Sequence, residues 1–193
     1  MRKIDEGKKE RVKLAVFEIT RDEGIAGLSF GKIAKHANVS SGTPYVYYKD
    51  KTDMLGKIYL DVKDLLDTGL RASIAAGKTP EDKLFNCVYH FAQQFHEHPL
   101  ESIYLDEVRD NPKVVTAEVI RQGNRLAQPV DNLFQELNEA GMFVINNQET
   151  LYALLFAPFI MVQKQRVVTD QPMMLSELET VIRLSIQGVL KNR

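Results

Sequence analysis

The stretch that decides the fold is residues 29–51, SFGKIAKHANVSSGTPYVYYKDK, which predicts two short helices joined by a tight turn. Apolar side chains recur in its first half at helical spacing, so that they share one face: Phe30, Ile33, Ala34 and Ala37. Ser29 stands just before this face, where a side-chain oxygen can cap the free amides of the first turn. We therefore expect a helix that begins after Ser29 and buries one side.

The segment Asn38-Val39-Ser40 interrupts this apolar pattern and predicts a turn. Asn tolerates the left-handed backbone that a tight turn requires, and Val39 can enter the core. Ser40 or Ser41 can cap the helix that follows. The second helix is therefore predicted to begin a few residues after the first one ends.

The residues after the turn carry hydrogen-bonding side chains, except for one glycine: Ser41, Gly42, Thr43, Tyr45 and Tyr47, and then Lys49 and Lys51. A helix end offers backbone amides and partial positive charge to phosphate, and a glycine lets the backbone approach a groove edge. Hydroxyl groups can donate to phosphate oxygens. Taken singly, these residues also fit the solvent-facing helix of an ordinary bundle. Together they are typical of a helix-turn-helix that binds DNA.

A wider pattern at fixed spacings extends from about residue 11 to residue 55: Val12, Ala15, Val16, Phe17, Glu23, Gly24, Leu28, Ser29, Ile33, Ala34, Val39, Ser40, Gly42, Thr43, Tyr45, Tyr48, Lys51, Met54 and Leu55. This segment resembles the amino-terminal domain of the TetR family of bacterial transcriptional regulators. The resemblance implies that Ser29 caps a helix and contacts phosphate, and that Ser41 and Gly42 approach base edges. It also implies phosphate contacts for these residues: Thr43, Tyr45, Tyr47 and Lys51. Lys49 joins the predicted DNA-binding set.

Two residues depart from the family pattern. Asn38 stands where the family usually has Gly, and Asn is the next most tolerant residue for positive φ. Pro44 stands where the family usually has Leu or Ile in the small core. Because proline is tolerated only in the first turn of a helix, the second helix should begin no earlier than Ser40 or Ser41. Pro44 also fills less volume, so the base contacts are less well defined than the phosphate contacts.

Charge and length agree with a two-part regulator. The chain has 193 residues and a net charge of -1, but residues 1–60 hold 12 Lys and Arg against 8 Asp and Glu, for +4. Residues 61–193 hold 13 against 18, for -5. Such asymmetry is compatible with nucleic-acid contact in the amino-terminal part, and also with an ordinary mixed surface. The length exceeds what a lone DNA-binding module needs.

A single cysteine, Cys87, excludes an internal disulfide framework, and it lies on an apolar face typical of a small buried hydrophobe. The chain opens MRKIDEGKKE, without a hydrophobic signal region, so we expect a cytoplasmic protein. The longest apolar run, residues 151–162, contains Pro158 and is shorter than the roughly 20 residues needed to span a bilayer. No membrane segment is predicted.

Capping signals divide the remaining chain into helices and predict an all-α fold of about nine helices. We expect a DNA-binding domain over residues 1–50 and a helical ligand-binding and dimerisation domain over residues 51–193. The predicted helices cover about residues 50–76, 80–99, 101–109, 112–141 with a kink at Pro129, 147–168, and 172 to the carboxyl end.

The last two helices are too apolar for an exposed surface and predict a two-fold dimer interface. The proposed interface residues are Leu151, Leu155, Phe159, Val162, Leu178, Val181, Ile182, Ser185 and Val189. Such a dimer would present two recognition helices to successive major grooves, about 34–36 Å apart on a palindromic site. The alternative is that these helices complete the core of a monomer.

The resemblance also implies an inducer pocket among the middle helices. Candidate lining residues are Phe85, Val88, Tyr89, Phe91, Phe95, Tyr104, Leu105, Val108, Gln122, Arg125, Leu126 and Phe134. Each of them also fits ordinary core or surface. The phenylalanines favour an apolar or amphipathic effector. Its binding is expected to tilt the helix that begins near Asp50 and so release the operator. Because most members of the family repress transcription, the resemblance implies a repressor, with activation as the alternative.

A metal site or an enzyme is not predicted. His90, His96 and His98 are six and two residues apart, so they do not share a helix face. No nucleophile arrangement, phosphate loop or paired carboxylate stands out, and no cofactor or catalytic residue is proposed. Two other hypotheses remain open: a TetR-like protein that organises DNA or answers to a protein partner without a small molecule, and a helical enzyme whose amino-terminal likeness is accidental.

Overall fold

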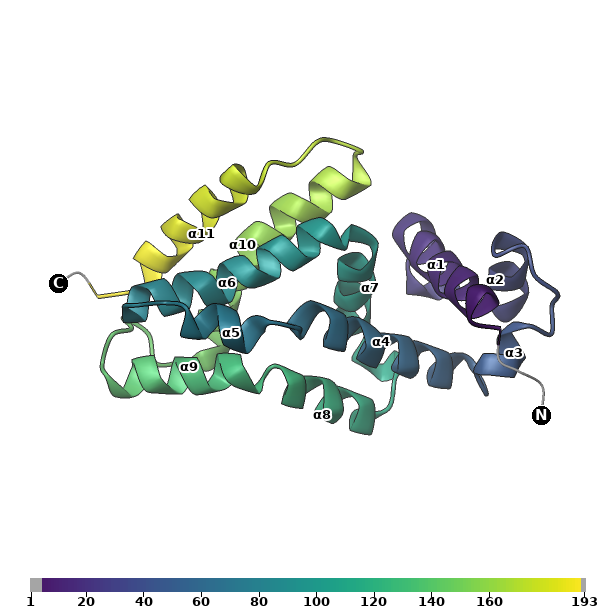
Figure 1. The fold of residues 1–193 in the computed structure, drawn as a ribbon, viewed down its shortest axis with the longest axis horizontal. Helices are drawn as coiled ribbons and strands as arrows, with labels where there is room; N and C mark the ends of the chain where they lie inside the picture. The colour runs from purple at the N-terminus through teal and green to yellow at the C-terminus, as the bar shows by residue number, and fades with distance from the viewer. Residues whose placement is uncertain (1–4, 192–193) are drawn as a thin grey trace. The chain divides into compact units, whose positions relative to one another are not determined.

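The computed structural model describes residues 5–191 and has the all-α fold that the sequence predicts. Within these residues it contains eleven α-helices, of which nine have seven or more residues, and two short 3-10 helices. The described residues form no strand, only an isolated antiparallel bridge between Phe143 and Leu190. The chain divides into two compact units, and its helices are labelled in Figure 1.

The first unit comprises the chain up to residue 64 and residues 100–124. Its elements are α1 (Glu6–Glu23), η1 (Ile25–Gly27), α2 (Phe30–His36), α3 (Pro44–Tyr47), most of α4 (Lys51–Asp67) and of α7 (Pro99–Asp110), η2 (Pro112–Val114) and most of α8 (Ala117–Leu126). α1 packs against η1, α2 and α3. Val12, Val16 and Ile33 are fully buried and form the centre of this small core.

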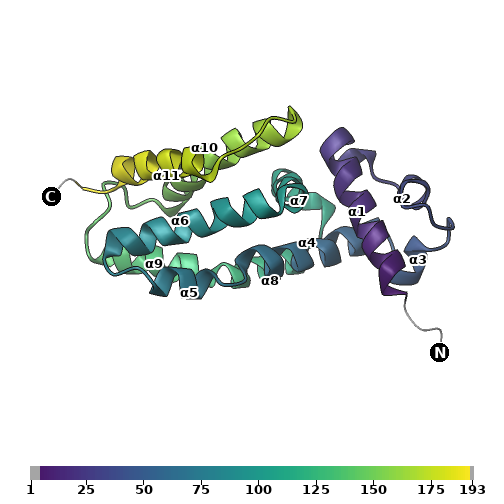
Figure 2. The same ribbon diagram turned by 45° about the horizontal axis from the view of Figure 1, so that its top comes forward.

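The second unit comprises residues 65–99 and the chain from residue 125. Its helices are α5 (Leu70–Ala75), α6 (Pro80–Glu97), α9 (Gln128–Glu139), α10 (Gln148–Val168) and α11 (Leu175–Val189). α6 packs against the four other helices, and α10 lies alongside α11, as Figures 1 and 2 both show. The predicted boundary after residue 50, between a DNA-binding and a ligand-binding domain, remains a prediction, because the two units are defined by packing alone.

Side-chain caps begin several helices where the sequence predicts them. Ser29 Oγ accepts from the Lys32 N–H, and Asn147 Oδ1 accepts from the Thr150 N–H at 2.8 Å. Thr79 and Asp82 form a complete capping box at the start of α6, with both bonds 3.0 Å long. Each such cap contributes about 1 kcal/mol. The predicted starts of these helices are confirmed. A cap depends only on residues that are close in the sequence, so it can be predicted from the sequence.

Three predicted helices have different bounds in the structure. The helix expected over residues 50–76 breaks after Asp67, because Gly69 adopts φ 86° and starts the separate helix α5. The segment expected to run from residue 112 to 141 forms η2, α8 and α9. Pro129 causes no kink there, since it lies in the first turn of α9, where proline is tolerated. The last helix begins at Leu175, three residues later than predicted.

α7 joins α1 and α4 within the first unit. The buried Tyr104 hydroxyl donates to the Leu55 carbonyl at 2.7 Å, and its ring packs edge-on against Phe17 with centroids 5.4 Å apart. The Ile25 N–H donates to Glu107 Oε2 at 3.3 Å. The first residues of α4 are therefore held in place by side chains from α7.

Two glycines allow α4 and α8 to approach closely in the same unit, as the adjacent ribbons of Figure 2 indicate. A β-carbon on Gly123 of α8 would lie 2.5 Å from Tyr59 Cε1, and one on Gly56 of α4 would lie 3.0 Å from Val119 Cγ2. Neither position has room for a side chain without a shift of its neighbour. The spacing of these two helices thus depends on both glycines.

Candidate DNA-binding site

α2 and the turn after it have the predicted geometry. Phe30, Ile33 and Ala34 are buried on one face of α2, and Ala37 is buried at its end. Asn38 adopts φ 51°, the left-handed conformation expected where the family usually has Gly. Val39 is half-buried, so it enters the core only in part. The backbone therefore turns sharply between α2 and the next helix.

The second helix of the motif is shorter than predicted. α3 comprises only Pro44–Tyr47, so Ser41 and Gly42 lie in the preceding turn rather than on the helix. Neither Ser40 nor Ser41 caps it; Thr43 holds the cap position and makes no capping bond with its side chain. The proline provides the physical reason, because its missing N–H and fixed φ suit the first helical position.

Thr43 and Pro44 face the interior of the domain. The Thr43 side chain is buried, and its Oγ1 lies 2.8 Å from Ser40 Oγ in a hydrogen bond. Pro44 is also buried, where the family usually has a larger aliphatic side chain. Because Thr43 is only 8% exposed, a phosphate contact from its hydroxyl would require the side chain to become more accessible. Its predicted role therefore depends on a local rearrangement.

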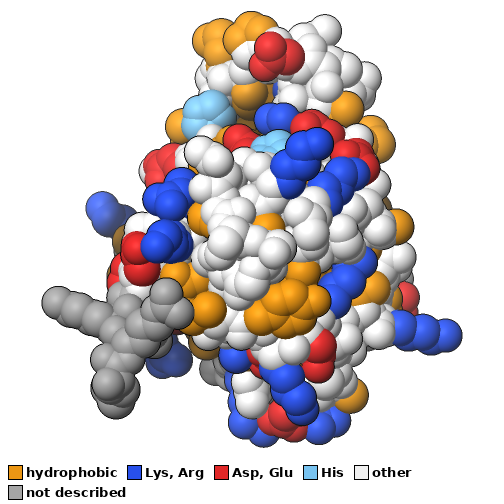
Figure 3. Space-filling model, turned by 90° about the vertical axis from the view of Figure 1, so that its right-hand side faces the viewer, with side chains coloured by type: hydrophobic (Ala, Val, Ile, Leu, Met, Phe, Trp, Pro, Cys, Tyr) orange, Lys and Arg blue, Asp and Glu red, His pale blue; other side chains and the backbone are white. Residues whose placement is uncertain are grey.

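The exposed part of the motif carries both polar and apolar side chains. Ser41 and Gly42 are exposed, and so are Tyr45 (64%) and Val46 (62%). The Tyr45 ring packs edge-on against Phe30, with centroids 4.6 Å apart, which fixes the ring while its surface remains open. In Figure 3, Lys and Arg side chains are spread over the face shown, between uncharged and hydrophobic ones. Val46 was not among the predicted DNA-binding residues, although its position as an apolar residue inside a polar segment is a signal for it.

Tyr47 and Ser29 already have partners inside the protein. The Tyr47 hydroxyl donates to the Asp5 carbonyl oxygen at 2.8 Å and so connects α3 to the start of α1. Ser29 is exposed, but its Oγ accepts the capping bond from Lys32 at 3.3 Å. A hydroxyl that accepts one bond can still donate another, so Ser29 can reach a phosphate without losing its cap. Tyr47 has only one hydrogen to donate.

Charged groups stiffen the junction between α3 and α4. The Asp53 N–H donates to Asp50 Oδ1 at 2.8 Å, and the Lys49 N–H donates to Asp53 Oδ2 at 2.9 Å. Lys57 forms an ion pair with Asp53 at 2.8 Å. The bonds from Lys57 and from the Lys49 amide hold the pKa of the Asp53 carboxyl below its usual range. The backbone that carries Lys49 and Lys51 is thereby well ordered.

Three lysines of the motif are available to an anion. Lys35, Lys49 and Lys51 are exposed, and none of them forms an ion pair within residues 5–191. In contrast, Lys32 pairs with Glu23 of α1. Lys35 was not among the predicted DNA-binding residues, although its position on the polar face of α2 is visible in the sequence.

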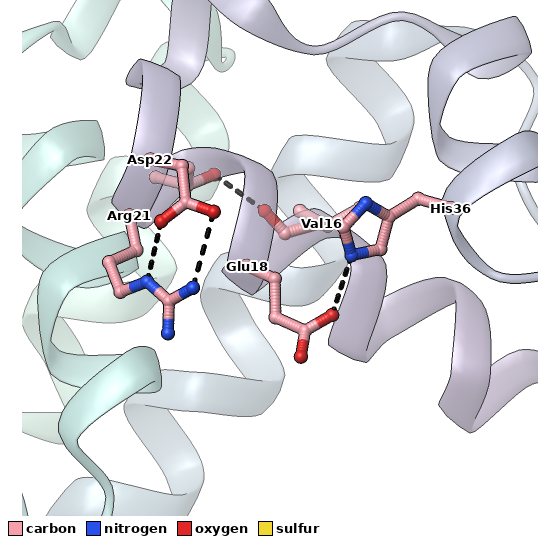
Figure 4. Close-up of polar contacts among 6 residues, drawn as sticks. Val16, Glu18, Arg21, Asp22 and His36 are labelled. Atoms are coloured by element: carbon pink, nitrogen blue, oxygen red, sulfur yellow. Dashed lines mark hydrogen bonds and ion pairs between the residues drawn. The ribbon is translucent and has the colours of Figure 1, made fainter.

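A hydrogen bond also joins α1 to α2. Glu18 Oε2 lies 2.8 Å from His36 Nε2, and Figure 4 shows the His36 ring turned toward this carboxylate. On the same helix, the Thr20 hydroxyl donates to the Val16 carbonyl at 2.7 Å, and Arg21 pairs with Asp22. The Glu18–His36 contact fixes the end of α2, where the turn begins.

The helices α2 and α3 are joined by a turn with a left-handed residue, and exposed hydroxyl groups and lysines lie around α3. This arrangement defines a helix-turn-helix domain, a class of domain that binds DNA in the major groove. Residues 16–58 match the family of bacterial regulatory proteins known as the tetR family. The amino-terminal domain is therefore a TetR-family domain. No curated protein matches the chain.

The whole chain has the fold of TetR-family transcription regulators. A TetR family transcription regulator from Marinobacter aquaeolei VT8 superposes with a TM-score of 0.83 at 21% identity, over 100% of both chains. One from Shewanella sp. PV-4 gives 0.76 at 16% identity, over 96% of this chain and 99% of the other. FadR from Bacillus subtilis, in complex with stearoyl-CoA, gives 0.67 at 21% identity, over 93% and 98%.

The predicted effector residues fall in both units. Tyr104, Leu105, Val108 and Gln122 belong to the first unit, and the other eight belong to the second. Gln122 and Arg125 are exposed, and Gln122 donates to Glu118. Phe85 stacks on Tyr89 and lies under the Arg183 guanidinium, 4.2 Å from its ring centroid. The predicted lining as a whole stays a prediction.

Phe91, Phe95 and Phe134 of the predicted lining join an aromatic cluster in the second unit. α10 contributes the other rings, Tyr152, Phe156 and Phe159. Phe156 is central, because it contacts Phe91, Phe134, Tyr152 and Phe159 with centroids 5.3–6.4 Å apart. The sequence prediction missed the α10 rings, although their spacing along the helix is a usable signal.

Most of the predicted dimer residues face the core of their own subunit. Six of the nine are buried: Leu151, Leu155, Phe159, Leu178, Ile182 and Val189. Val162, Val181 and Ser185 are half-buried. Other apolar side chains of α10 and α11 are exposed instead: Leu154, Met161, Val168 and Leu184. The two predicted helices remain candidates for subunit contact, but their exposed faces carry other side chains than the predicted interface residues.

The histidines show no metal-binding arrangement. Within residues 5–191 no group of three or more His, Cys, Asp or Glu side chains is placed to hold a metal ion. Instead, the buried His90 bonds through Nε2 with the Leu66 carbonyl oxygen at 3.1 Å. Among the described helices, none combines the length and apolar composition that crossing a membrane requires.

Proposed function

We propose that this protein is a TetR-like transcriptional regulator of the cytoplasm that binds a palindromic DNA operator as a homodimer and represses transcription until a small molecule releases it. The observation that carries the proposal is the exposed surface around α3. There Gly42, Tyr45 and Lys51 are exposed on a motif whose backbone is held by its own hydrogen bonds. The family match of residues 16–58 supports the same assignment.

A gel-shift experiment with the DNA that flanks the gene tests the proposal. The Tyr45→Ala, Lys51→Ala double variant removes an aromatic hydroxyl and a cation from the exposed surface, so specific binding should weaken strongly. Lys51→Ala alone should weaken binding to all sequences, and its two copies per dimer should reduce the salt slope of log K by about 2. The matched control is Lys78→Ala, which removes an exposed lysine outside the motif. Undiminished binding by the double variant would refute the contacts.

The dimer is supported by the apolar side chains that α10 and α11 expose in the single chain. Met161 is 68% exposed and Leu184 is 63% exposed. Large exposed apolar side chains gathered on neighbouring helices mark an interaction surface. We expect Met161→Lys with Leu184→Lys to shift the protein toward monomer in analytical ultracentrifugation, whereas Leu14→Lys in α1 should not. An unchanged dimer in the double variant would contradict this interface.

The effector is proposed to be a mainly apolar or amphipathic molecule. The aromatic cluster of α6, α9 and α10 supports this class, as does the structural similarity to a FadR that binds stearoyl-CoA. Binding would shift α4, which carries Lys51 at its first turn, and DNA is released if the shifted state binds the effector more tightly. A titration of the protein–DNA complex with long-chain acyl-CoA should then release DNA. Specific DNA binding that no apolar ligand perturbs would favour control by a protein partner.

A further inference from the structure

α10 buries a glutamine on its apolar face. Gln163 is 3% exposed, and neither its Oε1 nor its Nε2 has a hydrogen-bond partner within the described residues. It follows Leu155 and Phe159 at intervals of four residues, so it continues the buried side of the helix. Helical side chains lean toward the N-terminus of their helix. Gln163 is therefore a neighbour of Phe159 on the buried face of the helix.

Phe159 belongs to the aromatic cluster of the second unit. Its ring centroid lies 6.0 Å from that of Phe95, and Phe156 lies 5.7 Å from Phe91. Since residues 91 and 95 of α6 meet residues 156 and 159 of α10 in the same order, the two helices run in parallel here. Gln163 follows Phe159 by one turn on the same buried face of α10. The glutamine thus stands at the edge of the cluster.

A buried amide without partners destabilises a fold, whereas methionine at the same position would fill the space without that cost. A polar side chain that stabilises nothing in the protein itself is expected where it contacts a ligand. An amide can donate from Nε2 to a carbonyl and accept at Oε1 from an N–H or O–H group. Of the two cations that follow Gln163 on α10, Lys164 lies about 100° around the helix from it, and Arg166 is bound to the Pro172 carbonyl and to Glu177. A neutral ligand group therefore suits this position better than a carboxylate.

We infer that Gln163 is the polar contact of the effector site, and that the effector places an uncharged carbonyl group, of an amide, ester or thioester, beside it and its apolar body among the aromatic rings. This inference rests on the proposed function, because it concerns the ligand that controls DNA binding. It identifies a specificity residue that the predicted lining did not include.

Gln163→Met tests the inference, because it keeps the length of the side chain and removes both hydrogen-bonding atoms. The control is Gln93→Met, which makes the same exchange at an exposed position of α6. At equal protein concentration, the melting temperature of Gln163→Met should equal or exceed that of the wild type. A fall of more than about 4 °C would show that the amide is bonded inside the native protein, and would overturn the inference.

The ligand arm uses decanamide and decanoyl-CoA as carbonyl probes and decane as the matched probe without a carbonyl. Wild type and Gln93→Met should bind both carbonyl probes, and Gln163→Met should bind them about 3- to 10-fold more weakly in calorimetry. Binding of decane should be the same in all three proteins. Equal binding of the carbonyl probes by wild type and Gln163→Met, or no binding of either probe by the wild type, would overturn the assignment.

A gel shift with the same protein preparations separates this inference from the proposed function. Wild-type protein that binds the probes through Gln163 but no DNA would refute the function and leave the contact. Wild-type protein that binds DNA and releases it with a probe, while Gln163→Met releases it equally well, would refute the contact and leave the function.

Discussion

The close contact between α4 and α8 gives a prediction whose size follows from the structure. In Gly123→Ala the new β-carbon would lie 2.5 Å from Tyr59 Cε1, whereas unbonded carbons pack at about 3.5–4.0 Å. Tyr59 is 2% exposed, so its ring cannot move into solvent, and a shift of about 1 Å must be taken up by the helices. Overpacking of this kind costs about 1–3 kcal/mol, and the better helix propensity of Ala returns about 1 kcal/mol.

The net destabilisation should therefore reach up to about 2 kcal/mol, which lowers the melting temperature by up to about 8 °C for a chain of this size. Thermal unfolding followed by circular dichroism measures it. Gly31→Ala is the control, because its added carbon meets no atom within 4 Å and should stabilise the protein. In a Tyr59→Leu background the penalty of Gly123→Ala should largely disappear. A melting temperature equal to or above that of the wild type would refute this account of the contact.

Three further predictions concern the second unit. Burial lowers the pKa of His90, although its bond to Leu66 and the charges of Asp67 and Glu97 act the other way. Because His90 binds a proton more readily in the unfolded chain, the free energy of unfolding should fall as the pH drops below about 6.5. In urea unfolding, His90→Gln should lose less stability than the wild type over this pH range. Burial raises the pKa of the Cys87 thiol to about 12, so a thiol reagent should modify the protein only after urea unfolds it; rapid labelling of the native state would contradict the structure. Thr79→Ala removes one bond of the α6 capping box and should cost about 1 kcal/mol in urea unfolding, while Thr79→Ser should cost less; equal losses would argue against the cap.

Features that depend on neighbouring residues could be predicted from the sequence. The cap at Ser29, the capping box at Thr79 and the left-handed Asn38 all follow from side chains within a few residues of one another. Pro44 also predicts that α3 begins late, although the helix is shorter than the sequence pattern indicated. Local chemistry decides each of these positions before tertiary packing acts.

Features that depend on packing between helices could not be predicted in the same way. α10 is apolar on nearly all sides, so periodicity does not tell its buried residue Leu155 from its exposed residue Met161. The break at Gly69 lies inside a helical pattern that tolerates a glycine. The isolation of the Gln163 amide depends on the surrounding helices, and no local signal marks it.

The order of the units along the chain has a consequence for protein engineering. The chain leaves the first unit after residue 64, re-enters it at residue 100 and leaves it again after residue 124. The bond from Tyr104 to Leu55 spans this interruption. A chimera that grafts only the first 64 residues onto another regulator would therefore lose the native cover of α4. A graft that also carries residues 100–124 keeps the pieces that fold together, so exchanging specificities between such regulators requires two crossover segments.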